Sequence, residues 1–274
     1  MKLRDALTAA ANQLATSSAT PRLDAELLAA HAWGVDRNQL LLTYLDAQVP
    51  RAFAALVERR QQREPIAYIT GQAGFWSLDL QVCPGVLIPR PDSETLIEAA
   101  LAHFGGLGPK TVLDLGTGSG ALLLAALDCW PEARGLGVDQ SRAALDVAEG
   151  NAQRAAMQDR ILFQIGDWGQ GLAGPFDLIL CNPPYIADTY PLDPDVVDFE
   201  PMSALFAGPD GLDAYHRLAP DIARLLSPNG CACVEIGYDQ GVSAGDIFRA
   251  LGLNVKLRQD LAGQDRCLVL RKEP

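Results

Sequence analysis

The chain has 274 residues, of which 49% are hydrophobic, and its 22 Lys and Arg residues against 34 Asp and Glu residues give a formal net charge of −12. This length is enough for one large hydrophobic core and a smaller companion unit. The negative charge disfavours nucleic-acid binding, because the neutralisation of phosphates by Lys and Arg supplies most of that affinity. We therefore expect no direct nucleic-acid partner.

Membrane insertion and metal binding are also disfavoured by the composition. No run of 18 uncharged apolar residues occurs, and charges interrupt residues 1–15, so we expect neither a membrane span nor a signal peptide. The six cysteines form no C-x-x-C pair and only three histidines accompany them, so the ligand spacing of a zinc site is missing. Reduced, mostly buried thiols are typical of the cytosol. We expect a cytoplasmic monomer without a metal.

Residues 1–72 are predicted to form a helical unit. Apolar residues recur three and four positions apart, as at Phe53, Leu56 and Val57, which is the helix period. Asp36 is a candidate helix cap.

A cluster of arginines near the end of this unit is the best candidate for a local basic patch. It comprises Arg59, Arg60 and Arg63. On a helix, however, such a cluster is usually a face that water solvates.

Residues 73–89 are predicted to form a β-hairpin that links the helical unit to the rest of the chain. Apolar residues lean toward alternation in this stretch, as at Leu78, Leu80 and Val82, and Pro84 and Gly85 interrupt the pattern.

Residues 90–274 alternate short apolar runs with helical stretches. The runs lie at 111–115, 135–138, 161–165, 176–181, 231–236, 254–257 and 267–270. This alternation indicates an α/β, Rossmann-like sheet of seven strands with helices on both faces. Only residues 258–266 separate the last two runs, which is too short for a crossover helix, so we expect the last strand to be antiparallel.

A glycine-rich loop follows the first run. Glycines at a strand-to-helix turn let the backbone approach a ligand, which in open α/β sheets lies beyond the carboxyl ends of the strands. The candidate cofactor-binding residues here are Asp114, Gly116, Thr117, Gly118, Ser119 and Gly120, and a helix should begin at about Ala121. The spacing also fits a dinucleotide site, so a dinucleotide-dependent oxidoreductase or a non-catalytic nucleotide-binding module is an alternative. Asp114 favours S-adenosylmethionine, because a carboxylate suits the ammonium of a methionine moiety better than a pyrophosphate.

Acidic residues end the second and third runs. Asp139 is placed to accept hydrogen bonds from both ribose hydroxyls of a nucleoside. Asp167 is a candidate acceptor for an adenine amino group, and Trp168 is a candidate cover for the ring. A carboxylate at a strand tip is also often only solvated, so these residues support a nucleoside without naming it.

The fourth run ends in Asn182, Pro183, Pro184 and Tyr185. An amide nitrogen is a poor nucleophile because its lone pair is delocalised. The side-chain oxygen of Asn182 and the carbonyl of Pro183 can accept the two N–H bonds of such an amide, and these acceptors strengthen as the nitrogen becomes cationic. The prolines fix the backbone, and Tyr185 would stack on the flat group. The pattern predicts methyl transfer to a planar amide nitrogen.

With these residues placed, the chain resembles the HemK/PrmC-type release factor glutamine N5-methyltransferases over nearly its whole length. Further motifs carry the resemblance: R-E-P-I-A-Y-I-T-G at 63–71, L-I-P-R-P-D-S-E at 87–94, D-F-E-P at 198–201, G-P-D-G-L-D at 208–213 and E-I-G at 235–237. The family often has threonine at the position of Ser93 and serine at that of Cys181. Both changes leave the acceptors intact.

The resemblance implies a class I methyltransferase fold and methylation of the glutamine in the Gly-Gly-Gln motif of peptide chain release factors. It also implies that the N-terminal unit helps to hold the release factor, and that Asn182, Pro183, Pro184 and Tyr185 contact both the glutamine and the cofactor. Arg90 is expected near the pocket entrance, where it would steady the substrate loop. An ion pair with Asp92, Glu94 or Glu200 is an equally good interpretation of this arginine.

Two related functions are alternatives. A DNA adenine-N6 methyltransferase shares the tetrapeptide but must bind a duplex and flip its base. Only 61 residues separate Gly120 from Asn182 and 89 follow Tyr185, and the sheet uses both stretches, so no room remains for a DNA-reading domain. A glutamine methyltransferase of a ribosomal protein has the same chemistry, and only the family resemblance disfavours it.

Overall fold

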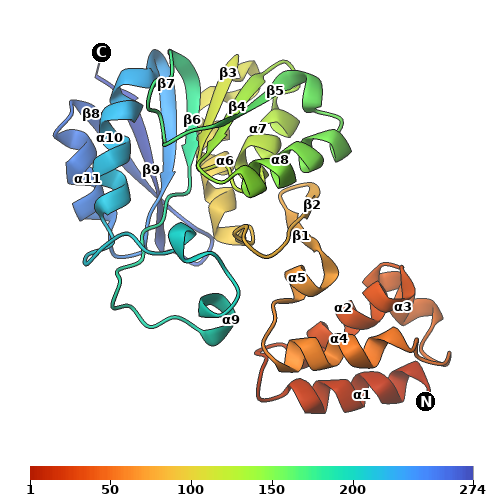
Figure 1. Cartoon of the computed structure of the whole chain (residues 1–274). Coiled ribbons are helices and arrows are strands. Elements are labelled where there is room, and N and C mark those ends of the chain that lie inside the picture. Colours follow the sequence, from red (N-terminus) through yellow and green to blue (C-terminus); the bar gives the residue numbers. More distant parts are fainter. Residues whose placement is uncertain (274) are drawn as a thin grey trace. The chain divides into compact units, whose positions relative to one another are not determined.

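The computed structural model describes residues 1–273, which divide into two compact units (Figure 1). The first unit comprises residues 1–72 together with residues 192–199. The second comprises residues 73–191 and those from Glu200 onward. Among the described residues, no helix is long and apolar enough to cross a membrane.

The first unit is helical. Its helices are α1 (Leu3–Leu14), α2 (Pro21–Trp33), α3 (Arg37–Thr43), α4 (Ala52–Gln61), α5 (Ile66–Thr70) and the short α9 (Pro194–Val197). Leu7, Leu28 and Phe53 are buried together in its core, as the helix period requires. The cap predicted at Asp36 is confirmed, since its side chain accepts the backbone N–H of Gln39 at 2.8 Å.

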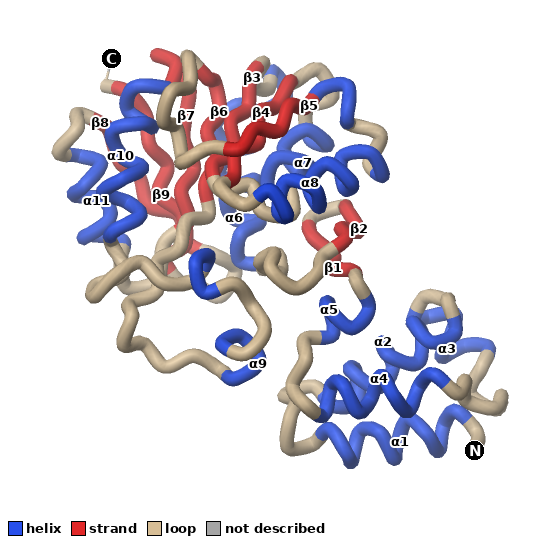
Figure 2. The backbone as a smooth tube through the Cα atoms, in the orientation of Figure 1, coloured by secondary structure: helices blue, strands red, loops and turns tan. Residues whose placement is uncertain are grey.

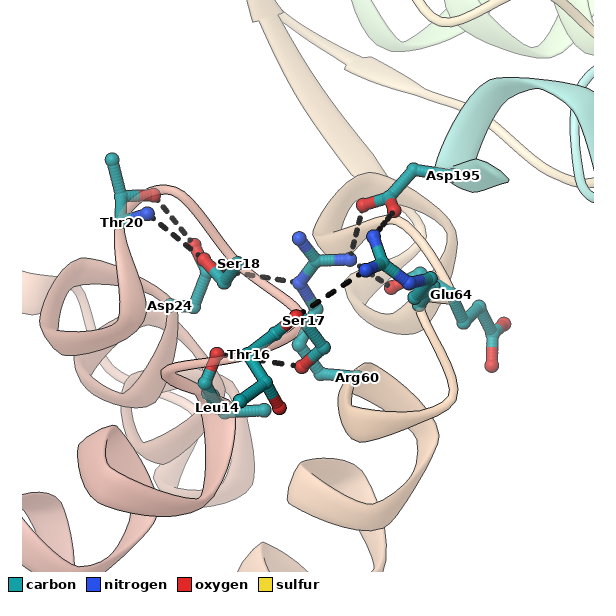
Figure 3. Close-up of polar contacts among 10 residues, drawn as sticks. Leu14, Thr16, Ser17, Ser18, Thr20, Asp24, Arg60, Glu64 and Asp195 are labelled. Atoms are coloured by element: carbon teal, nitrogen blue, oxygen red, sulfur yellow. Dashed lines mark hydrogen bonds and ion pairs between the residues drawn. The ribbon is translucent and has the colours of Figure 1, made fainter. Parts of the chain in front are cut away.

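Arg60 is neither a basic patch nor a solvated face, although both were the sequence-based interpretations. Its side chain is only 9% exposed. Its Nε donates to Asp24 at 2.7 Å and its Nη1 donates to Asp195 at 2.7 Å (Figure 3). Carboxylates from α2 and α9 thus neutralise an arginine on α4. Because Asp195 lies in residues 192–199, this ion pair fastens that segment to the helices of the first unit.

The hairpin is shorter than the stretch of residues 73–89 that was predicted. Strands β1 (Gln72–Phe75) and β2 (Leu78–Gln81) form a two-stranded sheet, and an irregular segment follows through Pro84 and Gly85. The pairing already ends at Gln81, and Pro84, which lacks a backbone N–H, cannot resume it.

The second unit is built on one seven-stranded sheet, drawn in red in Figure 2. Its strands are β3 (Thr111–Leu115), β4 (Arg134–Asp139), β5 (Ile161–Ile165), β6 (Phe176–Cys181), β7 (Leu226–Glu235), β8 (Leu253–Gln259) and β9 (Asp265–Lys272). Their order is β5-β4-β3-β6-β7-β9-β8. The strands from β3 to β7 pair in parallel, and β9 lies antiparallel between β7 and β8. The predicted fold class, with its antiparallel last strand, is confirmed.

Helices cover both faces of this sheet. The α-helices of this unit are α6 (Glu94–Phe104), α7 (Ala121–Cys129), α8 (Arg142–Arg154), α10 (Asp213–Leu225) and α11 (Gly241–Arg249), and short 3₁₀ turns lie at Pro91–Ser93, Gly105–Leu107, Gln158–Arg160 and Met202–Ala204. One core joins α6, α7 and α8 to strand residues such as Leu178 and Cys233. A second core joins α10 and α11 to the alternate residues, such as Ile179 and Val234. Successive strand residues therefore face opposite cores.

The strand register brings the loop residues of the site together. Leu115 pairs with Val138 on one side and with Cys181 on the other, and Cys181 pairs with Val234. The next residues lie at the same edge of the sheet: Asp139 and Glu235 end β4 and β7, and Gly116 and Asn182 directly follow β3 and β6. Hydrogen bonding between strands thus decides which side chains meet at the carboxyl edge.

Candidate active site

A pocket lies at this carboxyl edge of the sheet. Its lining includes many of the residues predicted from the sequence, namely Gly116, Thr117, Gly118, Ser119, Asp139, Asp167, Trp168, Asn182 and Pro184. Five predicted residues lie outside the lining: Asp114, Gly120, Pro183, Tyr185 and Arg90. The segment after the hairpin also lines the pocket, with Val86 and Pro89, and so does Ser203. Pro89 belongs to the motif at 87–94 that carried the family resemblance, but no local pattern had placed Val86, Pro89 or Ser203 in the pocket.

Asp114 lies behind the glycine loop rather than in the pocket wall. It is 1% exposed, and its Oδ2 accepts a hydrogen bond of 2.6 Å from the hydroxyl of Thr117, which does line the pocket. Among the described residues, its Oδ1 is the only buried side-chain oxygen or nitrogen without a hydrogen-bond partner. Burial, together with the charge of Asp139, raises its pKa to about 7 against the lowering effect of the Thr117 hydrogen bond. An unsatisfied carboxylate here fits a cationic ligand.

Asp139 supports the glycine loop as well as lining the pocket. Its Oδ2 accepts the backbone N–H of Gly118 and its Oδ1 accepts that of Ser141, both at 2.9 Å. Each carboxylate oxygen has a further lone pair. Two ribose hydroxyls could therefore be accepted without losing these backbone contacts.

Position 116 requires glycine because of its backbone conformation and because the Trp168 ring lies close to it. Its φ of +73° is in the left-handed region, and a Cβ atom there would lie 3.3 Å from Cζ3 of Trp168. The indole ring therefore lies against the glycine loop. Trp168 itself has a φ of +52°, an uncommon conformation for a non-glycine residue.

Asp167 lines the pocket, but its carboxylate already has protein partners. Both of its oxygens accept from Arg217, at 2.6 and 2.7 Å, and Oδ2 also accepts from Gln170 at 2.9 Å. The Arg217 pair is largely exposed, so its energetic contribution is small. A contact with an adenine amino group would use the lone pairs that remain.

Asn151 on α8 supports the glycine loop, and sequence reasoning missed it. Its side-chain nitrogen donates to the carbonyl of Ser119 at 2.9 Å and to that of Gln81 at 3.0 Å. Its oxygen accepts the N–H of Gln81 at 2.8 Å. The buried side-chain amide of Asn151 thus joins the glycine loop to strand β2 of the hairpin through both its nitrogen and its oxygen.

Asn182 and Tyr185 are joined through two residues from distant parts of the chain. Asn182 donates through Nδ2 to the hydroxyl of Ser93 at 3.0 Å, and Ser93 donates to Oε2 of Glu235 at 2.5 Å. Tyr185 donates its phenolic proton to Oε1 of Glu235 at 3.1 Å. Glu235 is 1% exposed, and burial raises its pKa to about 7 against the lowering effect of these two hydrogen bonds. Ser93 and Glu235 stood in the motifs that carried the family resemblance, but no local pattern gave them a role.

Tyr185 has its ring partly packed against the second core, and its carbonyl is also held. The side chain of Gln240 donates to that carbonyl at 2.9 Å and to the carbonyl of Gly211 at 3.3 Å. A Cβ atom on Gly211 would approach the Tyr185 carbonyl to 2.3 Å. Burial, with the adjacent Glu235 charge, raises the pKa of the Tyr185 phenol, so it stays protonated and can donate.

Arg90 makes the ion pair that was one of its two interpretations. Its guanidinium donates to Oε1 of Glu200, and Oε2 of Glu200 accepts the backbone N–H of Ile88 at 3.2 Å. Arg90 therefore helps to hold the segment after the hairpin to the chain at Glu200. Its side chain stays 39% exposed.

The thiols do not form a metal site in the part of the chain that the structure describes. Four of the six cysteines are buried, namely Cys181, Cys231, Cys233 and Cys267. No group of three or more His, Cys, Asp or Glu residues is arranged to hold a metal ion in residues 1–273.

Comparisons with known proteins agree with this geometry. A family model described as "PrmC N-terminal domain" matches residues 5–71, and one described as "Methyltransferase domain" matches residues 109–240. Among solved structures, the catalytic domain of hMettl16 in complex with an RNA hairpin has a TM-score of 0.58 at 16% identity, over 73% of this chain and 77% of that one. The Thermus thermophilus 16S rRNA N2 G1207 methyltransferase, in complex with AdoMet and guanosine, has a TM-score of 0.52 at 19% identity, over 74% of this chain and 50% of that one. At these identities the likeness shows the shared fold.

Sequence relatives are closer. A release factor glutamine methyltransferase of Rhodospirillum rubrum is 44% identical over 92% of this chain and 79% of its own length. Proteins of the same name from Caulobacter vibrioides and Moorella thermoacetica are 43% and 42% identical, over 93% and 100% of this chain and 90% and 100% of their own lengths. With this identity over nearly the whole length of both chains, and a methyltransferase sheet carrying the site described above, the chain belongs to the release factor glutamine methyltransferase family.

Proposed function

We propose that this enzyme transfers a methyl group from S-adenosylmethionine to the side-chain amide nitrogen, N5, of the glutamine in the Gly-Gly-Gln motif of peptide chain release factors. The relatives that share 42–44% of its residues carry the name of this activity. The cofactor, when bound, supplies a methyl group on a positively charged sulfur atom.

The residues at the carboxyl edge suit this cofactor. Asp139 would accept the ribose hydroxyls while keeping Gly118 in place. Asp114, whose Oδ1 lacks a partner, would stabilise the ammonium group from behind Thr117. Trp168 would cover the adenine ring.

The observation that carries the proposal is the orientation of the Asn182 amide. Its nitrogen donates to Ser93, so its oxygen remains as an acceptor. Together with the carbonyl of Pro183, this oxygen would accept the two N–H bonds of the substrate amide. These hydrogen bonds strengthen as the nitrogen gains positive charge, which lowers the barrier. Water can take up the proton that the methylated nitrogen then releases.

The proposed experiment is incubation with isotopically labelled S-adenosylmethionine and a purified release factor, followed by mass spectrometry of its peptides. We expect one methyl group on the glutamine of Gly-Gly-Gln. A ribosomal protein fraction and duplex DNA, offered in parallel, test the two alternative substrates. Label in either of these and none in the release factor would overturn the proposal.

We further propose that residues 1–72 bind the release factor and that residues 90–274 carry out the transfer, with the protein acting as a cytoplasmic monomer. Residues 1–72 match a family domain that occurs N-terminal to a methyltransferase domain here. The purified release factor should co-elute with the wild-type protein at a ratio of one to one. Loss of that complex when exposed residues of α1 to α4 are changed would support the division of labour, and its persistence would oppose it.

A further inference from the structure

We propose that Glu235 and Ser93 are positioning residues, which fix the orientation of the Asn182 amide and of the Tyr185 ring for methyl transfer. This inference rests on the function proposed above, because it assumes that Asn182 presents its oxygen to the reacting amide. The residues form one continuous hydrogen-bonded chain from Asn182 through Ser93 and Glu235 to Tyr185.

The direction of each hydrogen bond follows from the charge on Glu235. An ionised carboxylate only accepts, so Ser93 must donate its single proton to Oε2. The lone pairs of the Ser93 hydroxyl are then available only to a donor, which is Nδ2 of Asn182. The reverse amide orientation would place an oxygen against a hydroxyl that has no proton left to give. Glu235 thus selects, through Ser93, the amide orientation that leaves Oδ1 free.

The other carboxylate oxygen of Glu235 fixes the position of the Tyr185 ring, also through a hydrogen bond that it accepts. It accepts the phenolic proton at 3.1 Å, and the side chain of Gln240 holds the backbone carbonyl of the same tyrosine. The first and last residues of the tetrapeptide are therefore fixed by one carboxylate. The two prolines between them restrict the backbone further.

Burial makes this network effective. Glu235 and Ser93 are 1% and 3% exposed, so water cannot replace a lost partner. The fold places them there by strand register, because Asn182 and Glu235 each follow the paired residues Cys181 and Val234. Ser93 ends the 3₁₀ turn Pro91–Ser93, directly before α6, which packs against β7.

The other charged and titratable groups near Glu235 do not compete with Ser93 and Tyr185 for its carboxylate oxygens. Arg266 forms ion pairs with Asp92 at 3.2 Å and with Asp260 at 3.3 Å. The hydroxyl of Tyr215 donates a hydrogen bond of 3.1 Å to the backbone carbonyl of Glu235 rather than to its side-chain carboxylate. The Cys181 thiol is buried, and burial raises its pKa, so it stays neutral.

The test uses four variants of the full chain: Ser93→Ala, Ser93→Thr, Glu235→Gln and, as a matched control, Ser227→Ala. Ser227 is also a buried serine that donates to a carboxylate, Asp177 at 3.2 Å, away from the pocket. Turnover with a release factor, the KM for that substrate and the affinity for S-adenosylmethionine are measured for each, together with thermal unfolding.

We expect Ser93→Ala and Glu235→Gln to lower kcat by about 10- to 100-fold, the effect typical of residues that orient a reacting group. The KM and the cofactor affinity should change little. Ser93→Thr keeps the hydroxyl and should restore most of the lost turnover, and Ser227→Ala should match the wild type.

Wild-type turnover in Ser93→Ala and Glu235→Gln would overturn the inference, and so would a Ser93→Thr variant that is folded but as slow as Ser93→Ala. The affinity for S-adenosylmethionine shows whether a slow variant is folded. Failure of the wild type to methylate any release factor would count against the proposed function instead. In that case the same variants are compared on the substrate that the wild type does methylate.

Discussion

Asp139 accepts the backbone N–H of Gly118 at 2.9 Å, so the residue at the tip of β4 holds the glycine loop that follows β3. We expect Asp139→Ala to weaken S-adenosylmethionine binding about 10- to 100-fold, because two hydrogen bonds to a charged acceptor would be lost. Isothermal titration calorimetry measures this. Asp146→Ala removes an exposed aspartate of α8 and serves as the control. Equal affinities for the two variants would show that Asp139 does not contact the ribose.

Asn182→Ala separates transfer from cofactor binding. Removal of one acceptor for the reacting amide should lower kcat by about 100-fold or more, as the loss of a transition-state hydrogen bond commonly does. S-adenosylmethionine should still bind with nearly wild-type affinity, because the glycine loop and Asp139 are untouched. Single-turnover methylation and equilibrium binding provide the two measurements. A parallel loss of both would show that Asn182 mainly shapes the cofactor pocket.

Binding of the cofactor should release a proton from Asp114 near neutral pH. Burial raises the pKa of this carboxyl to about 7 in the protein alone, and a nearby ammonium group would lower it again. The affinity for S-adenosylmethionine should therefore increase as the pH rises through about 7. Calorimetry in buffers of different ionisation enthalpy counts the protons released. Asp114→Asn should abolish that release, and persistence of the full proton release in this variant would point to another group.

Glu235 should make turnover and stability respond to pH in opposite directions. Its pKa in the folded protein is about 7, against an ordinary value of 4.5, because burial penalises the charged form. Turnover needs the ionised form, so kcat should rise as the pH increases through about 7. The raised pKa means that the folded state binds this proton more tightly than the unfolded state does. The contribution of the protonated Glu235 to the stability of the fold is therefore complete below pH 4.5 and is lost as the pH rises through about 7.

Glu235→Gln provides the comparison for this pH dependence. Between pH 4.5 and about 7, the free energy of unfolding of Glu235→Gln should vary less with pH than that of the wild type, because the carboxyl group that titrates is gone. Urea denaturation across this interval measures the difference. Any pH dependence of stability that the Glu235→Gln variant retains belongs to the groups that remain in it, among them Asp114. Identical pH profiles of stability in the two proteins would contradict the assignment.

The ion pairs of Arg60 should stabilise the first unit unequally. Asp24→Asn should cost about 3 kcal/mol, because it leaves a buried guanidinium without its less exposed partner. Asp195→Asn should cost about 1 kcal/mol, since Asp195 is more exposed and the Asp24 pair remains. Urea denaturation gives both values. Limited proteolysis should also cut residues 192–199 faster in Asp195→Asn.

Asp46→Asn is the control for these changes. Asp46 pairs with Lys2 and Arg4 at an exposed position, so its loss should leave stability unchanged. A destabilisation by Asp46→Asn equal to that of Asp24→Asn would show that burial of the Arg60 pair is not the cause.

Several features of the site could be predicted because they are local in sequence. The glycines at Gly116 and Gly118 follow a strand directly, and Asp139 ends the next strand, so alternation of strands and helices was enough to place them at one edge. The same reasoning did not predict that Asp114 is buried behind the loop, outside the lining of the pocket.

The sequence by itself determined the order of strands and helices, the antiparallel end of the sheet and the chemical types at the strand tips, because these depend on periodicity and on neighbouring residues. Only the tertiary structure decided that Glu235 meets Ser93, 142 positions away, and that Asp195 meets Arg60, 135 positions away. Such contacts depend on strand register and on the burial of charged groups. Both arise only when distant segments pack together, so no local pattern encodes them.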